Sequence, residues 1–263
     1  MSAPPLDVAP IPAFEDNYIW LVRRPGRAEC AVVDPGDEDA VIARLEADGL
    51  DLAAILVTHK HRDHVGGIEA LKERYPKAVV FGPAGEPIPL RDVALRDGDT
   101  VTAPGVAAAF LVMGVPGHTE DHIAYLGEGV LFCGDTLFAG GCGRVFSGTH
   151  AQLHASLQRI ARLPPDTRVY CAHEYTEANL GFARWVEPDN GDLVQRITEV
   201  DGLRGRGAPT VPSTIALERL TNPFLRVGEP TVVAAAERWA GRPLADAAEV
   251  FRAVRTWKDR DYD

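Results

Sequence analysis

This chain of 263 residues has few cysteines and no long apolar run. Its four cysteines form no Cys-x-x-Cys pair, so neither a disulfide framework nor a thiolate zinc site is expected. No apolar run approaches the roughly 20 residues that cross a bilayer, and the N-terminus lacks the basic and apolar segments of a secretory signal. We therefore expect a cytoplasmic protein with no membrane partner.

Positively charged residues are also few: the chain has 27 Lys and Arg against 38 Asp and Glu, which gives a net charge of -11. This balance opposes binding to a polyanion, so no nucleic-acid partner is expected. The apolar content of 46% is nevertheless enough for a chain of this length to bury a sizeable core. A disordered chain is therefore excluded, and we predict a globular protein. It is expected to be a monomer.

Short apolar runs bounded by Gly, Pro and Asp occupy the first two-thirds of the chain and predict buried strands. They lie at 19–22, 31–33, 53–57, 78–81, 107–112, 130–133 and 168–171. Helical patterns fall between some of these runs, which indicates sheets covered by helices. These patterns lie at 37–47, 68–74 and 150–162.

Beyond about residue 175 the apolar strand runs stop, and the pattern becomes mostly helical. We therefore predict two domains, residues 1–174 and 175–263. Within the second, the Gly- and Pro-rich stretch 202–209 predicts a flexible loop.

Histidine is scarce, yet three of the eight histidines fall between positions 59 and 64, together with Asp63. In extended geometry after the run 53–57, His59 and His61 share one face and could bind one ion. Asp63 and His64 would project nearby from the first turn of a helix. Crowding these groups without a metal would have an uncompensated desolvation cost, so the spacing indicates two adjacent metals.

Three later apolar runs are each followed by another candidate ligand: His118, Asp135 and His173. Strand ends at one sheet edge lie together, so these residues are expected to converge with the histidine cluster. The combined set suits two divalent ions, zinc first, with iron or manganese also accessible. Asp135 is the predicted bridge, since a carboxylate has two oxygens. The remaining histidines are predicted not to bind metal: His122, His150 and His154.

The motif T58-H-K-H-R-D-H64, followed by G117-H-T119, G134-D135 and C171-A-H173, resembles the metallo-β-lactamase superfamily. Further stretches are similar to glyoxalase II, the hydroxyacylglutathione hydrolases. They are G134-D-T-L-F138, G141-C-G-R144, H173-E-Y175, T221-N-P-F-L-R-V227 and R255-x-x-K258. The resemblance covers nearly the entire chain and implies an αββα sandwich followed by a small helical domain that helps to hold glutathione.

The same resemblance divides the ligands between two ions. It implies His59, His61 and His118 on one ion, Asp63, His64 and His173 on the other, and Asp135 as the bridge. Asp63 and Asp135 would be catalytic carboxylates that act by binding metal. Asp34, ahead of a Pro-Gly turn, is expected to serve that turn, and contact with a ligand histidine is the alternative.

Four positions are implied to contact glutathione: Arg144, Tyr175, Arg255 and Lys258. Arg255 and Lys258 lie three apart on a predicted terminal helix and could clamp a carboxylate of the substrate. A solvated basic helix end is the alternative. Phe146 stands where the family often has tyrosine, and Arg144 where it often has lysine, which bears on affinity more than on reaction type.

The resemblance implies hydrolysis of S-D-lactoylglutathione and similar S-2-hydroxyacylglutathione thioesters, the second step of methylglyoxal detoxification. A hydroxide between the metals would attack the thioester carbonyl, and the thiolate could leave without a dedicated general acid. Three alternatives are a one-metal persulfide dioxygenase, a nuclease and a metal-binding scaffold without activity.

Overall fold

The computed structural model describes residues 5–262. Contacts divide the chain into two compact units. Unit 1 runs up to Gly114 and includes Asp121–Gly134, and unit 2 comprises Val115–Glu120 and the chain from Asp135 onward. Among the described residues, no helix combines the length and apolar character that crossing a bilayer requires.

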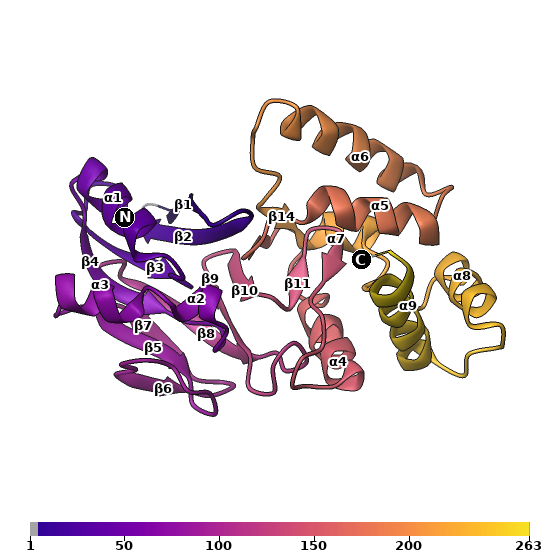
Figure 1. Ribbon diagram of the computed structural model, residues 1–263, viewed down its shortest axis with the longest axis horizontal. Coiled ribbons are helices and arrows are strands. Elements are labelled where there is room, and N and C mark those ends of the chain that lie inside the picture. The colour runs from indigo at the N-terminus through magenta and orange to yellow at the C-terminus, as the bar shows by residue number, and fades with distance from the viewer. Residues whose placement is uncertain (1–4, 263) are drawn as a thin grey trace. The chain divides into compact units, whose positions relative to one another are not determined.

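Unit 1 contains a six-stranded sheet, drawn in indigo and violet in Figure 1. Its strands, in spatial order, are β1 (Asp7–Ala13), β2 (Asn17–Arg23), β3 (Glu29–Val33), β4 (Asp51–Leu56), β5 (Val79–Pro83) and β6 (Val93–Leu95). The first three pair antiparallel, whereas β3 to β6 run parallel. The four strands predicted before residue 82 are confirmed as β2 to β5; β1 and β6 were not predicted.

Helices α1 (Glu38–Asp48) and α3 (Ile68–Arg74) pack on one face of this sheet. Leu45 and Leu71 share a core cluster with the strand residues Val32 and Ile55. Residues that point to the opposite face, such as Ala31, are buried as well. The central strands are therefore continuous apolar runs, as expected of parallel strands buried on both faces.

A second six-stranded sheet has the spatial order β14-β13-β10-β9-β8-β7. Its strands are β7 (Thr100–Ala103), β8 (Ala108–Gly114), β9 (Ile123–Gly127), β10 (Val130–Gly134), β13 (Arg168–Cys171) and β14 (Ser213–Thr214). Strands β7 to β10 form an antiparallel meander. A separate ribbon pairs β11 (Leu137–Phe138) with β12 (Gly141–Cys142). The runs predicted at 107–112, 130–133 and 168–171 are confirmed as β8, β10 and β13.

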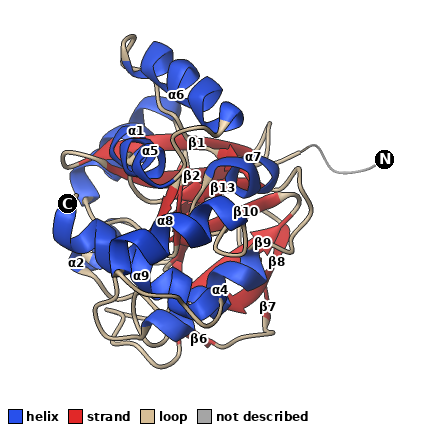
Figure 2. Cartoon of the chain, turned by 90° about the vertical axis from the view of Figure 1, so that its right-hand side faces the viewer, coloured by secondary structure: helices blue, strands red, loops and turns tan. Residues whose placement is uncertain are grey.

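After β13 the chain is mostly helical, as predicted, and Figure 2 shows these helices in blue. The helices of unit 2 are α4 (His150–Ile160), α5 (Thr176–Val186), α6 (Gly191–Arg204), α7 (Ile215–Thr221), α8 (Pro230–Ala240) and α9 (Ala247–Asp261). The loop predicted from residue 202 is wrong at its start, because α6 continues to Arg204. Val200, one turn earlier, packs in a core cluster with Leu180 and sustains the helix. The domain boundary after residue 174 stays a prediction.

A buried ion pair lies between helices α6 and α7 of unit 2. The Arg196 guanidinium donates to the carboxylate of Glu218 and also to the hydroxyls of Ser213 and Thr221. Arg196 is 3% exposed and Glu218 is 0% exposed. The second Glu218 oxygen accepts from the Gly140 amide, so the pair is fully embedded in hydrogen bonds.

Removing one partner of such a pair leaves the other as an uncompensated buried charge. We expect the R196M variant to lose about 3–5 kcal/mol of stability, because the Glu218 carboxylate would stay buried without its counter-ion. Urea unfolding followed by circular dichroism measures the loss. The R206M variant, altered at an exposed arginine, is the control; equal unfolding midpoints for the two variants would refute the expectation.

Candidate metal centre

In unit 1, the chain leaving β4 carries four of the predicted ligands. His59 is completely buried, and His61 precedes the four-residue helix α2 (Arg62–Val65), which contains Asp63 and His64. Nε2 of His59 lies 3.0 Å from Nδ1 of His61, and Nε2 of His64 lies 3.2 Å from Oδ2 of Asp63. The imidazoles of His59 and His64 are also adjacent, with ring centroids 4.1 Å apart.

Gly36 permits the turn after β3 to approach α2. A Cβ atom at this position would overlap the carbonyl oxygen of Asp63. Only glycine therefore fits, and the Pro-Gly turn noted in the sequence has a packing reason. The turn brings Asp34 next to the ligand cluster.

Asp34 orients His64 from within unit 1. Its Oδ1 accepts from the Thr58 amide at 2.7 Å, and its Oδ2 accepts from the Thr58 hydroxyl at 2.7 Å. Oδ2 also lies 3.1 Å from Nδ1 of His64. The expectation that Asp34 serves only its turn is wrong, because both oxygens have partners after β4. Bonding at Nδ1 leaves Nε2 as the nitrogen of His64 suited to a metal.

Two further polar contacts hold the cluster and were not predicted. The Asn17 side-chain amide donates to Oδ2 of Asp63 at 3.0 Å, and the buried Glu86 carboxylate accepts from the Lys60 amide at 2.6 Å. These partners are 46 and 26 residues apart in sequence. No local pattern marks either contact, since each depends on how the strands are arranged in the folded sheet.

In unit 2, Asp135 lies between two imidazoles. Its Oδ2 is 3.4 Å from Nε2 of His118, and its Oδ1 is 3.4 Å from Nε2 of His173. Nδ1 of His118 lies 2.8 Å from the carbonyl oxygen of Arg144, which makes Nδ1 the protonated nitrogen. Each oxygen of Asp135 thus faces Nε2 of a different histidine. The role of Asp135 as a bridge between two metals stays a prediction.

His173 is packed between aromatic rings. Its imidazole stacks on Tyr175, with centroids 4.7 Å apart and planes 6° apart, and Phe138 meets it edge-on. Tyr175, predicted from the resemblance to contact substrate, therefore also supports a candidate ligand.

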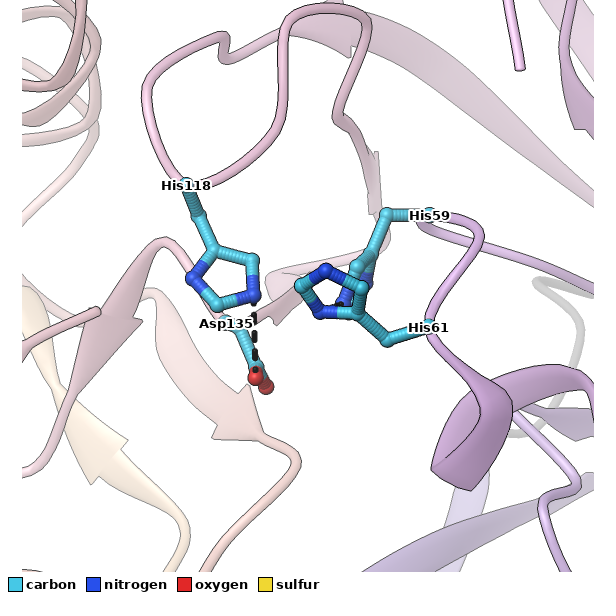
Figure 3. Close-up of side chains that lie close together, drawn as sticks. All are labelled: His59, His61, His118 and Asp135. Carbon is cyan, nitrogen blue, oxygen red and sulfur yellow. Dashed lines mark hydrogen bonds and ion pairs between the residues drawn. The ribbon is translucent and has the colours of Figure 1, made fainter. Parts of the chain in front are cut away.

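Candidate ligand atoms gather in three groups among residues 5–262, and in each group they lie within 4.8 Å of one another. The groups are His59, His61, His118 and Asp135; Asp63, His64 and His173; and Asp34, His59 and His64. Figure 3 draws the first group and the ion pair of His118 with Asp135. All seven predicted ligands fall in the first two groups, and His122, His150 and His154 fall in none. These buried His/Asp clusters are consistent with a binuclear metal site.

The two thiols of unit 2, Cys142 and Cys171, are buried. Burial raises the pKa of Cys142 to about 11 and that of Cys171 to about 12, so both are neutral at pH 7. All four cysteines are buried and none forms a disulfide, as expected from their spacing. Neither Cys142 nor Cys171 therefore offers a thiolate nucleophile at pH 7.

The predicted glutathione contacts on α9 are buried. Arg255 is 0% and Lys258 is 7% exposed, which rules out a solvated basic helix end. Arg255 donates to the carbonyl of Cys142 at 3.0 Å and to Asp259 at 2.9 Å. The half-exposed Arg144 lies 3.7 Å from the same Asp259 carboxylate. A contact between these residues and a substrate stays a prediction.

Comparison with known families agrees with the fold and the ligand pattern. The model described as "Metallo-beta-lactamase superfamily" matches residues 13–173, and "Hydroxyacylglutathione hydrolase C-terminus" matches residues 174–261. The first match defines the class as the metallo-β-lactamase fold, with candidate metal ligands at the positions described above. The predicted αββα sandwich with a helical C-terminal part is confirmed.

Two relatives of similar sequence identify the family within this fold class. The "Hydroxyacylglutathione hydrolase" of Pseudomonas fluorescens (strain SBW25) is 54% identical over 256 residues, covering 97% of this chain and 99% of that protein. The protein of the same description from Alkalilimnicola ehrlichii is 53% identical over 254 residues, with 97% and 99% covered. The chain therefore belongs to the hydroxyacylglutathione hydrolase, or glyoxalase II, family.

Solved structures share the fold at lower identity. ETHE1 from Myxococcus xanthus superposes with a TM-score of 0.67 at 25% identity, covering 98% of this chain and 92% of that chain. TTHA1623, crystallised in a di-iron-bound form, gives a TM-score of 0.57 at 26% identity, with 83% and 100% covered.

The contact between Asp34 and His64 can be tested by metal affinity. We expect the D34N variant to bind zinc about 10–100-fold more weakly, because the amide holds the His64 ring less firmly than the carboxylate does. Competition with a chromophoric chelator measures the affinity. The D39N variant, changed at an exposed aspartate of α1, should bind zinc like the unaltered protein. Equal affinities for D34N and D39N would show that Asp34 does not orient a ligand.

Proposed function

We propose that this chain hydrolyses S-D-lactoylglutathione and similar S-2-hydroxyacylglutathione thioesters to glutathione and the 2-hydroxy acid. Hydroxyacylglutathione hydrolysis, the glyoxalase II step of methylglyoxal detoxification, is the activity of the family to which the chain belongs. The observation that carries the proposal is the set of five histidines and two aspartates that make up two of the three groups of candidate ligand atoms. The match of residues 174–261 to the C-terminal part of these hydrolases supports the substrate class.

The donor set supports two divalent ions. We assign His59, His61 and His118 to one, Asp63, His64 and His173 to the other, and Asp135 to both. Nitrogen-rich ligands with few carboxylates suit zinc, our proposed metal, and also accommodate iron or manganese. A relative of the same fold holds two irons, which supports a pair of ions in this arrangement.

The residues of the site prepare hydrolysis by fixing atoms in place. When bound, ions of this kind supply water that ionises near neutral pH and stabilise charge on a carbonyl oxygen. Asp34 holds His64, and the Arg144 carbonyl holds His118, in the tautomer that can bind metal through Nε2. The leaving thiolate has a conjugate acid with a pKa of about 8.5, so no general acid need be supplied by the chain. Asp63 and Asp135 act as ligands in this scheme, not as proton carriers.

Glutathione recognition is assigned to unit 2. Arg144, Tyr175 and Lys258 are the proposed contacts, and the positive charges of Arg144 and Lys258 suit the carboxylates of the tripeptide. Arg255 belongs to the same set through its positive charge, although its side chain is buried. We propose residues 1–174 as the catalytic domain and 175–263 as the glutathione-binding domain, in agreement with the ranges of the two family models.

The alternatives raised by the sequence have less support. A one-metal dioxygenase would give no metal-binding task to Asp63 and His173, which lie in the second ligand group. A nuclease would need a basic surface, against a net charge of -11. We further propose a cytoplasmic monomer; four cysteines without a disulfide suit a reducing compartment.

The assignment predicts metal-dependent loss of the thioester. Purified protein loaded with zinc should hydrolyse S-D-lactoylglutathione, followed as the decline of thioester absorbance. Prolonged chelation should abolish turnover, and added zinc should restore it, because the attacking water depends on the metal. Absence of turnover in protein shown to carry metal would contradict the proposed substrate.

A further inference from the structure

Arg255 is the most buried cation of α9, and it makes hydrogen bonds to two residues of unit 2. Its side chain is 1% exposed, and the guanidinium lies 5.1 Å from the centroid of the Phe224 ring. One nitrogen donates to the carbonyl of Cys142 at 3.0 Å, and the other pairs with Asp259 at 2.9 Å. A buried cation is costly unless it is paired, so these partners fix the side chain in place.

Cys142, which accepts a hydrogen bond from Arg255, lies two residues before a contact with the candidate metal ligand His118. Cys142 ends β12, and two residues later the carbonyl of Arg144 accepts the hydrogen bond from Nδ1 of His118 at 2.8 Å. Between them, Gly143 is pressed against the site: a Cβ there would overlap the carbonyl oxygen of Asp135 and lie 3.1 Å from Nδ1 of His118. Residues 142–144 therefore have little room to move without displacing the imidazole.

A second link joins the same residues. Asp259, one turn after Arg255 on α9, lies 3.7 Å from Nε of Arg144. The Asp259 carboxylate therefore contacts both arginines, one buried and the other with 55% of its side chain exposed. Both ends of residues 142–144 thus contact α9. The Cys142 carbonyl accepts from Arg255, and the Arg144 side chain lies next to Asp259.

We propose that Arg255 is a positioning residue for the metal ligand His118, and that it acts through residues 142–144. This inference rests on the proposed function, in which His118 binds one of two ions. Arg255 sets the place of the Cys142 carbonyl, and the same short segment presents the Arg144 carbonyl to Nδ1. The tautomer and the ring orientation of His118 then follow from that hydrogen bond, since the partner of the second nitrogen orients a metal-bound imidazole.

A positioning role and a substrate contact predict different results. A residue that only binds substrate raises KM and leaves both kcat and the metal site unchanged. A residue that positions His118 alters the metal site even when no substrate is present. Lys258, three positions along the same helix, is the matched comparison, because it is proposed to bind substrate.

The experiment uses the full chain with cobalt in place of zinc, and the variants R255M, R255K, K258M and R252M. We expect R255M to bind cobalt about 10–100-fold more weakly, as for loss of other groups that orient a ligand, with an altered visible spectrum and a lower kcat. R255K, which can restore one donor to Cys142, should be intermediate in both properties. K258M should raise KM with the cobalt spectrum unchanged, and R252M, altered at an exposed position of α9, should behave as the parent.

An R255M variant with the affinity and cobalt spectrum of the parent, and with only KM raised, would overturn the proposal. If R255M does not fold, the R255K and D259N variants test the proposal instead, because each weakens one contact between α9 and residues 142–144. Cobalt spectra like that of the parent in both variants would also overturn the proposal. Failure of the proposed function is distinguishable, since it would appear as absent thioester hydrolysis by the metal-loaded parent. The cobalt measurements need no substrate.

Discussion

The site depends on one constraint: each imidazole that is to bind a metal must have its other nitrogen held by the protein. Asp34 does this for His64, and the Arg144 carbonyl does it for His118. Nδ1 of His59 similarly lies 3.1 Å from the Thr58 hydroxyl. These partners fix the tautomer and direct Nε2 toward the ion, which a histidine free to rotate would not do. The surrounding fold brings a carboxylate to His64, a carbonyl to His118 and a hydroxyl to His59.

Close backbone approach makes those partners available. Gly36 lets the turn after β3 rest on α2, and Gly143 lets the loop after β12 rest on Asp135 and His118. Both approaches would be blocked by any side chain, so the two glycines determine the site as much as the ligands do. Helix α9 of unit 2 also contacts this loop, because Arg255 donates to the carbonyl of Cys142. The buried charge of Arg255 is compensated by Asp259.

The sequence was sufficient for the seven candidate ligands because their spacing follows strand geometry: alternate residues share a face, and strand ends meet at one edge. It was insufficient for Asn17 and Glu86, whose partners lie far along the chain. Strand β1 was missed because its prolines weaken the strand pattern, although an edge strand tolerates them. The role of Asp34 was misjudged because a Pro-Gly turn explains an aspartate locally, while the contact with His64 depends on the parallel pairing of β3 with β4.

The central claim is that seven residues hold two metal ions with Asp135 between them. A crystal structure of the zinc-loaded protein, with anomalous diffraction recorded on both sides of the zinc edge, tests it most directly. We expect two zinc peaks about 3.5–4 Å apart, each within bonding distance of one oxygen of Asp135. A single peak, or two peaks that do not share Asp135, would contradict it.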